Sequence, residues 1–225
     1  MKRAAWIRAL VYTASVLAAL TLLIAALHTS AARPLLARLG MKCPLDASPA
    51  EVEAARLESA RVTRGTEAAA SRPALGFVLD QTTLADVKAW AEKKNVSCDE
   101  ARTRSLLHCT NVPETALGKS GPEFNDLDFG FSPSNARLVN ISAWRSGMSS
   151  RAASAQMKAI AASLAAELGA PASTKGDLSA RYFASGPMRT AFVQYRFSDY
   201  IADVTATNIP DKGLILREHY MSARD

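Results

Sequence analysis

An apolar stripe at helical spacing stands out in the second half of the chain. Its members, three or four residues apart, are Ala153, Met157, Ile160, Leu164 and Leu168. This is the period of one face of an α-helix. Ser149 or Ser150 precedes the stripe as a cap, and Gly169 with Pro171 follows it as a stop signal. The pattern predicts a helix between these residues.

Alternation of period two marks the strands. Leu127, Phe129 and Phe131 alternate with Asp128 and Gly130, which indicates a strand buried on one face. Similar short runs predict strands at 96–100, 106–111, 127–132 and 137–145, and again at 178–185, 188–197, 200–208 and 213–221.

A further helix is predicted to follow Thr83. The residues from Thr83 to Asp86 have the form of a capping box, and Asn95 is suited to the left-handed backbone conformation that ends a helix. Each half of the region then has one helix followed by four antiparallel strands, over 82–145 and 149–221. The sequence therefore predicts an α+β fold over 75–225, with the two halves as candidates for a tandem pair of αββββ units.

This order of elements resembles the tandem helix-plus-antiparallel-sheet arrangement of beta-lactamase-inhibitor-protein-like domains. The stretch from Leu168 to Pro171 is similar to the Gly-x-Pro helix exit of small outer-membrane-assembly lipoproteins of that shape. The resemblance implies an architecture and no activity, because function does not follow from fold.

The N-terminal segment has the pattern of a membrane anchor. Lys2, Arg3 and Arg8 precede an uncharged run from Ala9 to Leu27. As a helix this run is about 28 Å long, close to the ~30 Å hydrocarbon core of a bilayer. The pattern predicts that 1–32 anchors the chain in the inner membrane as a single span, with the C-terminal domain in the periplasm.

A cleaved signal peptide and a buried helix of a soluble protein are the alternatives for this segment. Ser30, Ala31 and Ala32 form a small-x-small triplet at which a signal peptidase cuts. Cleavage after Ala32 would leave a secreted or periplasmic soluble domain.

Residues 33–74 are predicted to form a juxtamembrane helical stalk. Ser48, Pro49 and Glu51 carry helix-start signals, and the helix is expected to run toward Ala70. Its apolar face contains only small or short side chains, so we expect it to bind the globular body weakly.

The cysteines predict one disulfide. If the runs 95–100 and 105–111 pair about a turn at 102–105, Cys98 lies opposite Cys109. Cross-strand neighbours are close enough for a bridge after a small adjustment. A disulfide indicates an oxidising compartment, whereas two free buried thiols are the alternative in a reducing one. Cys43 has no partner in this scheme.

The net charge of +6 does not indicate a nucleic-acid partner. Lys2, Arg3 and Arg8 account for half of it, and the remaining charges form no basic stripe interleaved with aromatic residues. The basic residues of the leader are better interpreted as topology signals.

Motifs of the common reaction classes are missing. The sequence has no Gly-x-Ser-x-Gly elbow, no phosphate-binding loop, no dinucleotide-binding turn and no His-Glu-x-x-His helix. We therefore predict no cofactor and no metal, and a non-enzymatic protein. A small hydrolase-like envelope enzyme that uses Asp126, Asp128 or His219 without a recognisable motif is the alternative.

The candidate binding residues lie on the polar face of the second group of strands. Each of them alternates with buried positions in its own strand or comes to the same side across a hairpin. The candidates are Gln194, Arg196, Asp203, Thr205 and His219. Arg217 and the aromatic Phe192 are expected nearby. If helices cover one face of the sheet, these residues mark its open face, which would bind an envelope protein partner. A merely solvated face is the alternative.

Overall fold

The computed structural model describes Thr21, residues 48–101 and residues 105–224. The chain divides into two units, Met1–Ser48 and Pro49–Asp225, and the sheet belongs to the second. The predicted membrane span, Ala9 to Leu27, lies outside the described residues apart from Thr21. Within the described ranges, no helix combines the length and the apolar character needed to cross a membrane.

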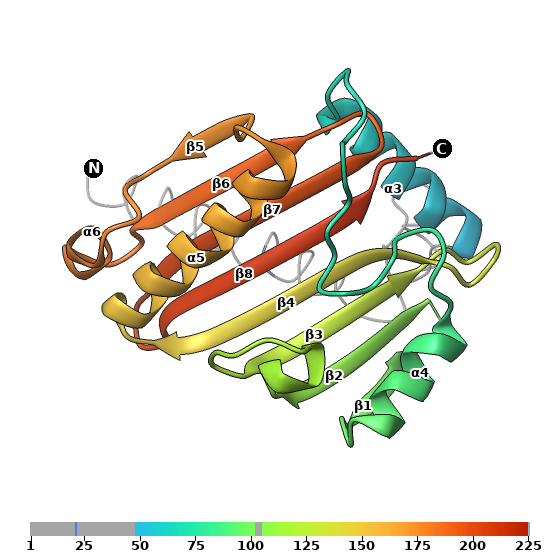
Figure 1. The fold of residues 1–225 in the computed structure, drawn as a ribbon, viewed down its shortest axis with the longest axis horizontal. Helices are drawn as coiled ribbons and strands as arrows, with labels where there is room; N and C mark the ends of the chain where they lie inside the picture. Colours follow the sequence, from blue (N-terminus) through green and yellow to red (C-terminus); the bar gives the residue numbers. More distant parts are fainter. Residues whose placement is uncertain (1–20, 22–47, 102–104, 225) are drawn as a thin grey trace, which may run out of the picture. The chain divides into compact units, whose positions relative to one another are not determined.

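An antiparallel sheet of eight strands forms the centre of the second unit (Figure 1). The strands are β1 (Cys98–Ala101), β2 (Leu106–Val112), β3 (Phe124–Phe131), β4 (Leu138–Met148), β5 (Ser173–Lys175), β6 (Thr190–Arg196), β7 (Tyr200–Ile209) and β8 (Gly213–Ser222). Their order is β1-β2-β3-β4-β8-β7-β6-β5. Two four-stranded meanders thus meet where β4 pairs with β8. The predicted α+β class is confirmed.

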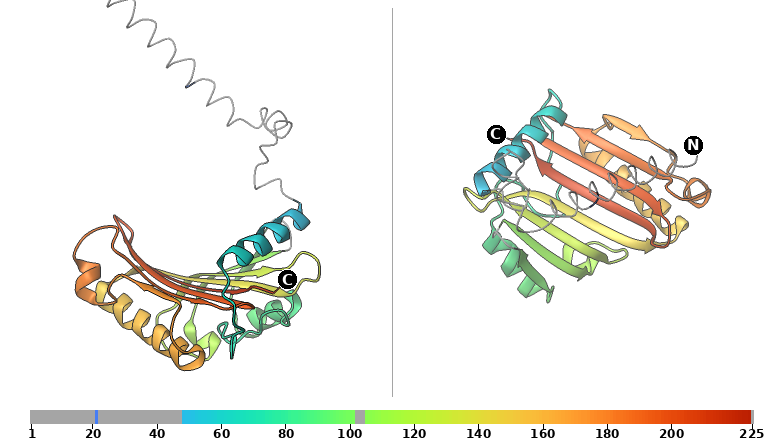
Figure 2. Two further views of the ribbon diagram at one scale, coloured as in Figure 1. Left: turned by 90° about the horizontal axis from the view of Figure 1, so that it is seen from above. Right: turned by 180° about the vertical axis from the view of Figure 1, so that it is seen from behind.

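Helices lie on both faces of the sheet (Figure 2). α4 (Leu84–Lys93) and α5 (Ser150–Leu168) cover one face, and α3 (Pro49–Thr63) crosses one end of the other. A 3₁₀ turn, η2 (Glu114–Leu117), and the short helix α6 (Ala180–Ala184) complete the described elements.

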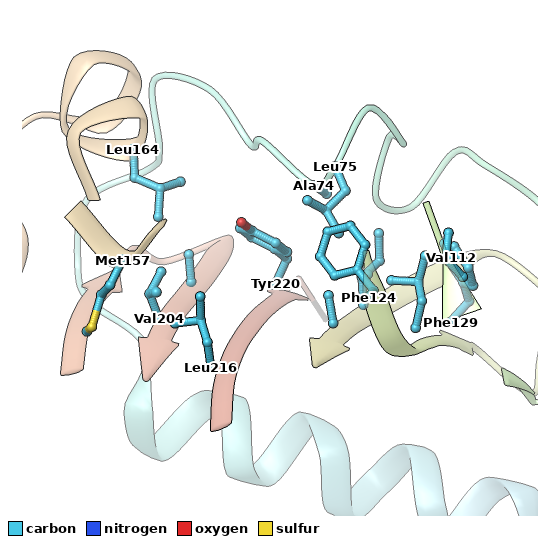
Figure 3. Packing of buried hydrophobic residues seen from close by; sticks show 14 of the residues in the cluster. Ala74, Leu75, Val112, Phe124, Phe129, Met157, Leu164, Val204, Leu216 and Tyr220 are labelled. Atoms are coloured by element: carbon cyan, nitrogen blue, oxygen red, sulfur yellow. The ribbon is translucent and has the colours of Figure 1, made fainter. Parts of the chain in front are cut away.

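The main core lies between the sheet and the helices α4 and α5. Leu127, Phe129 and Phe131 of β3 are all buried, as their alternation predicts. From α5, Met157 and Leu164 point toward the sheet (Figure 3). The apolar stripe predicted from the sequence is therefore the face by which α5 packs on the strands.

Local signals set the helix starts. The Thr83 side chain accepts a hydrogen bond from the Asp86 amide, and the Asp86 carboxylate accepts one from the Thr83 amide, which completes the predicted capping box. Ser149 caps α5 by accepting from the Ala152 amide. Asn95 has the predicted left-handed conformation, with a φ of 53°.

The predicted disulfide is confirmed. β1 and β2 pair with Cys98 opposite Cys109, and the two sulfurs are bonded. The bridge fastens β1, an edge strand of four residues, to its only neighbour in the sheet.

A buried ion-pair network joins the central strands to the helix layer. Arg145 of β4 donates to Glu218 of β8 over 2.6 Å, and it also pairs with Glu114 of η2. Tyr220 donates to the second oxygen of Glu218, and Gln156 of α5 donates to Glu114. Because each carboxylate has several donors, the charges are buried at a tolerable cost.

One predicted strand, 178–185, is wrong. Most of this segment forms the helix α6, which Ser179 caps by accepting a hydrogen bond from the Tyr182 amide. The fourth strand of this half is instead β5, three exposed residues that pair with β6. A five-residue helix is too short to show a helical period in the sequence.

In the part of 33–74 that the structure describes, the chain differs from the predicted stalk. The compact unit begins at Pro49, and α3 ends at Thr63 before reaching Ala70. Ala60 is buried against Ile201 of β7 and against Ala223, which directly follows β8. Small side chains allow this close contact, so the short apolar face of α3 packs on the sheet.

Candidate functional site

The pleat of the sheet brings the predicted binding residues to one face. Gln194 of β6 pairs with Asp203 of β7, which pairs with His219 of β8. Residues opposite one another in an antiparallel pair point to the same side. All five predicted residues share this side, which we call the open face. It is opposite α4 and α5, and among the described elements only α3 covers part of it (Figure 2).

Asp203 lies at the centre of an ion pair. Arg196 Nη2 lies 2.6 Å from Asp203 Oδ1, and His219 Nδ1 lies 3.8 Å from Oδ2. Burial opposes ionisation of Asp203, but the interactions with His219 and Arg196 outweigh it and hold the pKa of the carboxyl below its usual value. Asp203 is therefore a paired anion that orders its neighbours.

A second cluster occupies the same face on β2 and β3. His108 Nδ1 lies 2.7 Å from Asp128 Oδ1, and its Nε2 lies 3.6 Å from Asp126 Oδ1. The two predicted carboxylates thus flank one imidazole, each at a different nitrogen. In the described part of the chain, no group of three His, Cys, Asp or Glu side chains could hold a metal ion.

Ser142 of β4 lies between the two clusters in the register, opposite both Asp128 and His219. Its hydroxyl accepts a hydrogen bond from Arg217 Nη2 over 3.1 Å. Among the described residues no hydrogen bond joins Ser142 to His219, so these residues do not form the nucleophile–base contact of a serine hydrolase.

An aromatic and cationic patch completes the open face. The Arg217 guanidinium carbon lies 4.8 Å from the centre of the Trp144 ring. Beside it lies a shallow depression of about 240 Å³, which is lined by Trp144, Thr205, Thr207, Ile209, Ile215 and Arg217. Of these, sequence reasoning identified Thr205 and Arg217. Trp144 could have been placed on the same face as Ser142, because both alternate with Ala143 in the predicted strand, but the register across β4 and β8 was not detectable.

A larger, polar cleft of about 410 Å³ lies between α3 and the sheet. Its charged side chains form ion pairs with neighbouring side chains or hydrogen bonds to the backbone. Arg56 makes two hydrogen bonds to Glu53 and one to the Ser222 carbonyl, and Asp80 pairs with Arg72. These contacts hold α3 and the loops together.

Comparison with known protein families, curated proteins and solved structures finds no match for this chain.

Proposed function

We propose that this chain is a membrane-anchored, non-enzymatic protein of the cell envelope that binds a protein partner through the open face. The single observation that carries the proposal is the composition of this face. A half-buried tryptophan and an arginine stacked on it border an apolar depression. Aromatic residues and arginine are enriched at the centres of protein interfaces.

Two features support a place in the envelope. The charged and apolar pattern of residues 1–32 is that of an export signal or anchor. The Cys98–Cys109 disulfide is typical of an oxidising compartment. A single span in the inner membrane, with the C-terminal unit in the periplasm, is consistent with both.

Photocrosslinking from the open face tests the binding function. A photoreactive amino acid is placed at Thr205 on the open face, or at Lys158, which is exposed on α5. In living cells we expect a discrete crosslinked product from position 205 and none of that mass from position 158. No product from 205, or the same products from both positions, would overturn the proposal.

The location is tested separately. A reporter that is active only in the periplasm is fused after Asp225, and a thiol gel-shift assay follows Cys98 and Cys109. We expect an active reporter and oxidised cysteines. N-terminal sequencing of the mature chain decides between a retained anchor and cleavage after Ala32. Reporter activity confined to the cytoplasm would contradict the proposed location.

A small hydrolase-like enzyme is the second candidate, because two clusters of an imidazole with carboxylates lie on the open face. The Asp128→Asn and His219→Gln chains test it. Loss of cellular function with crosslinking from position 205 intact would favour an enzyme. Loss of both together, with the fold retained, is expected for a binding face.

A further inference from the structure

Arg217 lies at the centre of the open face, and its guanidinium group contacts only uncharged groups of the described residues. Its Nη2 donates to the Ser142 hydroxyl, and its guanidinium stacks on Trp144. Its Nε is buried and has no hydrogen-bond partner. No described carboxylate forms an ion pair with it, whereas Arg196 on the same face pairs with Asp203 and the buried Arg145 pairs with two glutamates.

This arrangement is unfavourable for an isolated domain. A partly desolvated cation is costly unless it is paired, and a buried N–H without an acceptor loses its hydrogen bond to water. The Trp144 ring offsets part of this cost through a cation–π contact. The remaining free-energy cost is offset if a bound group places an anion against the guanidinium of Arg217.

The depression beside Arg217 indicates the size of that group. Its volume of about 240 Å³ is below the range of roughly 300–1,000 Å³ that is usual for small-molecule sites. Ile209 of β7 and Ile215 of β8 are the aliphatic residues of its lining, and Thr205 and Thr207 of β7 also border it. A single apolar side chain fits this lining better than a cofactor does.

The surrounding charges favour one carboxylate over a phosphate or a lipid surface. Asp126 is opposite Trp144 in the register, Asp203 lies on β7, and His219 and Arg217 share β8. Phosphate groups and anionic membranes are recognised by clusters of basic residues. One unpaired arginine between two aspartates instead suits a single negative charge.

We propose that Arg217 and the depression bind an acidic residue and an adjacent apolar residue in an exposed peptide segment of the partner. The inference rests on the proposed function of the open face and specifies what that face recognises. Arg217 binds the carboxylate, and the apolar side chain enters the depression beside Trp144.

Fluorine NMR of the full-length chain tests this inference. The three tryptophans are replaced by 5-fluorotryptophan, and the Trp144→Phe chain identifies the signal of Trp144. The probes are the capped peptide acetyl-Leu-Asp-Leu-amide and its neutral analogue acetyl-Leu-Asn-Leu-amide. We expect the Asp peptide to shift the Trp144 signal saturably, and the Asn peptide to bind at least about tenfold more weakly, because it lacks the charge-assisted contact.

Two variants provide the matched comparison. Arg217→Gln is expected to reduce Asp-peptide binding to the level of the Asn peptide. Arg189→Gln, which removes an arginine that stacks on Tyr182 and does not line the depression, is expected to leave binding unchanged. Equal binding of both peptides, or no effect of Arg217→Gln, would overturn the inference.

Other occupants give distinct results. A larger shift with phosphatidylglycerol vesicles or inorganic phosphate than with the Asp peptide would overturn the inference in favour of lipid or phosphate. A shift that depends on protein concentration alone would indicate a second copy of the chain and equally overturn it. If crosslinks from position 205 persist in the Arg217→Gln chain, the binding face stands and only the carboxylate preference fails.

Discussion

Asp203 connects the charge of the open face to the stability of the fold. Its folded pKa lies below its usual value, so its ionised form stabilises the fold above the unfolded pKa of about 3.9. This contribution is lost as the pH falls through the folded pKa. We expect Asp203→Asn to lower the free energy of unfolding by about 1 kcal/mol at pH 7. The difference from the parent chain should shrink in urea titrations as the pH falls below about 3.9, and it should disappear once the pH is below the folded pKa. A difference independent of pH would contradict this account.

A substitution of Arg145 is expected to reduce stability by a larger amount, because its two partners are buried. Replacing it by methionine leaves Glu114 and Glu218 in the interior without their cation. We expect a loss of about 3–5 kcal/mol in urea unfolding. The chain that combines Arg145→Met with Glu114→Gln and Glu218→Gln should recover much of this loss. Arg189→Met, at an exposed position, is the control, and an equal loss there would contradict the role of burial.

These residues also show what the sequence can predict at this scale. The pairing of Cys98 with Cys109 followed from a single short turn, because the turn sets the register of the two strands in a hairpin. The Arg145 network could not be predicted, since Glu218 is 73 positions away and Glu114 is on a 3₁₀ turn. The missing counter-charge of Arg217 likewise depends on three strands from distant parts of the chain.

At the level of elements, the attachment of α3 is open to a direct test. Ala60 is buried against the sheet, whereas Ala55 on the same helix is exposed. Ala60→Glu would place a carboxylate in this apolar contact. Burying this charge costs more free energy than a short helix gains by packing on the sheet. We expect limited proteolysis to cut between residues 49 and 66 while 75–224 stays resistant. Ala55→Glu should resist like the parent chain, and equal cleavage of both variants would show that Ala60 does not fasten α3.

The disulfide stabilises the edge strand β1. Closing a loop of this size contributes about 2–3 kcal/mol by reducing the entropy of the unfolded chain. A chain with Cys98→Ser and Cys109→Ser should lose that amount in urea unfolding. Hydrogen exchange should become faster chiefly in β1, which has one neighbour in the sheet. The Cys43→Ser chain serves as the reference, and equal stability of the two would contradict the prediction.

Element lengths explain where sequence reasoning succeeded and failed. The 19 residues of α5 repeat their apolar period several times, and the long strands β7 and β8 alternate over ten residues each. β5 has three exposed residues and α6 has five, so neither shows a period. The docking of α3 escaped prediction because its buried contact involves one alanine, whose methyl group carries little hydrophobic signal.

At the scale of the whole molecule, the two meanders share one continuous sheet. Its covered face has the main core, and its opposite face has both histidine clusters and the aromatic patch. The predicted division into a helix plus four strands agrees with the order of elements in each half, apart from the additional elements η2 and α6. That the halves join through their last strands was not predictable, because it depends on pairing between β4 and β8 rather than on a local pattern.

The central position of β8 has a consequence for the timing of folding. β8 is translated after all seven other strands, yet it lies between β4 and β7. Until it emerges from the ribosome, both meanders have an unpaired inner edge and no shared core, so the final structure depends on contacts distant in sequence. Such a chain therefore cannot close its sheet until its synthesis is almost complete.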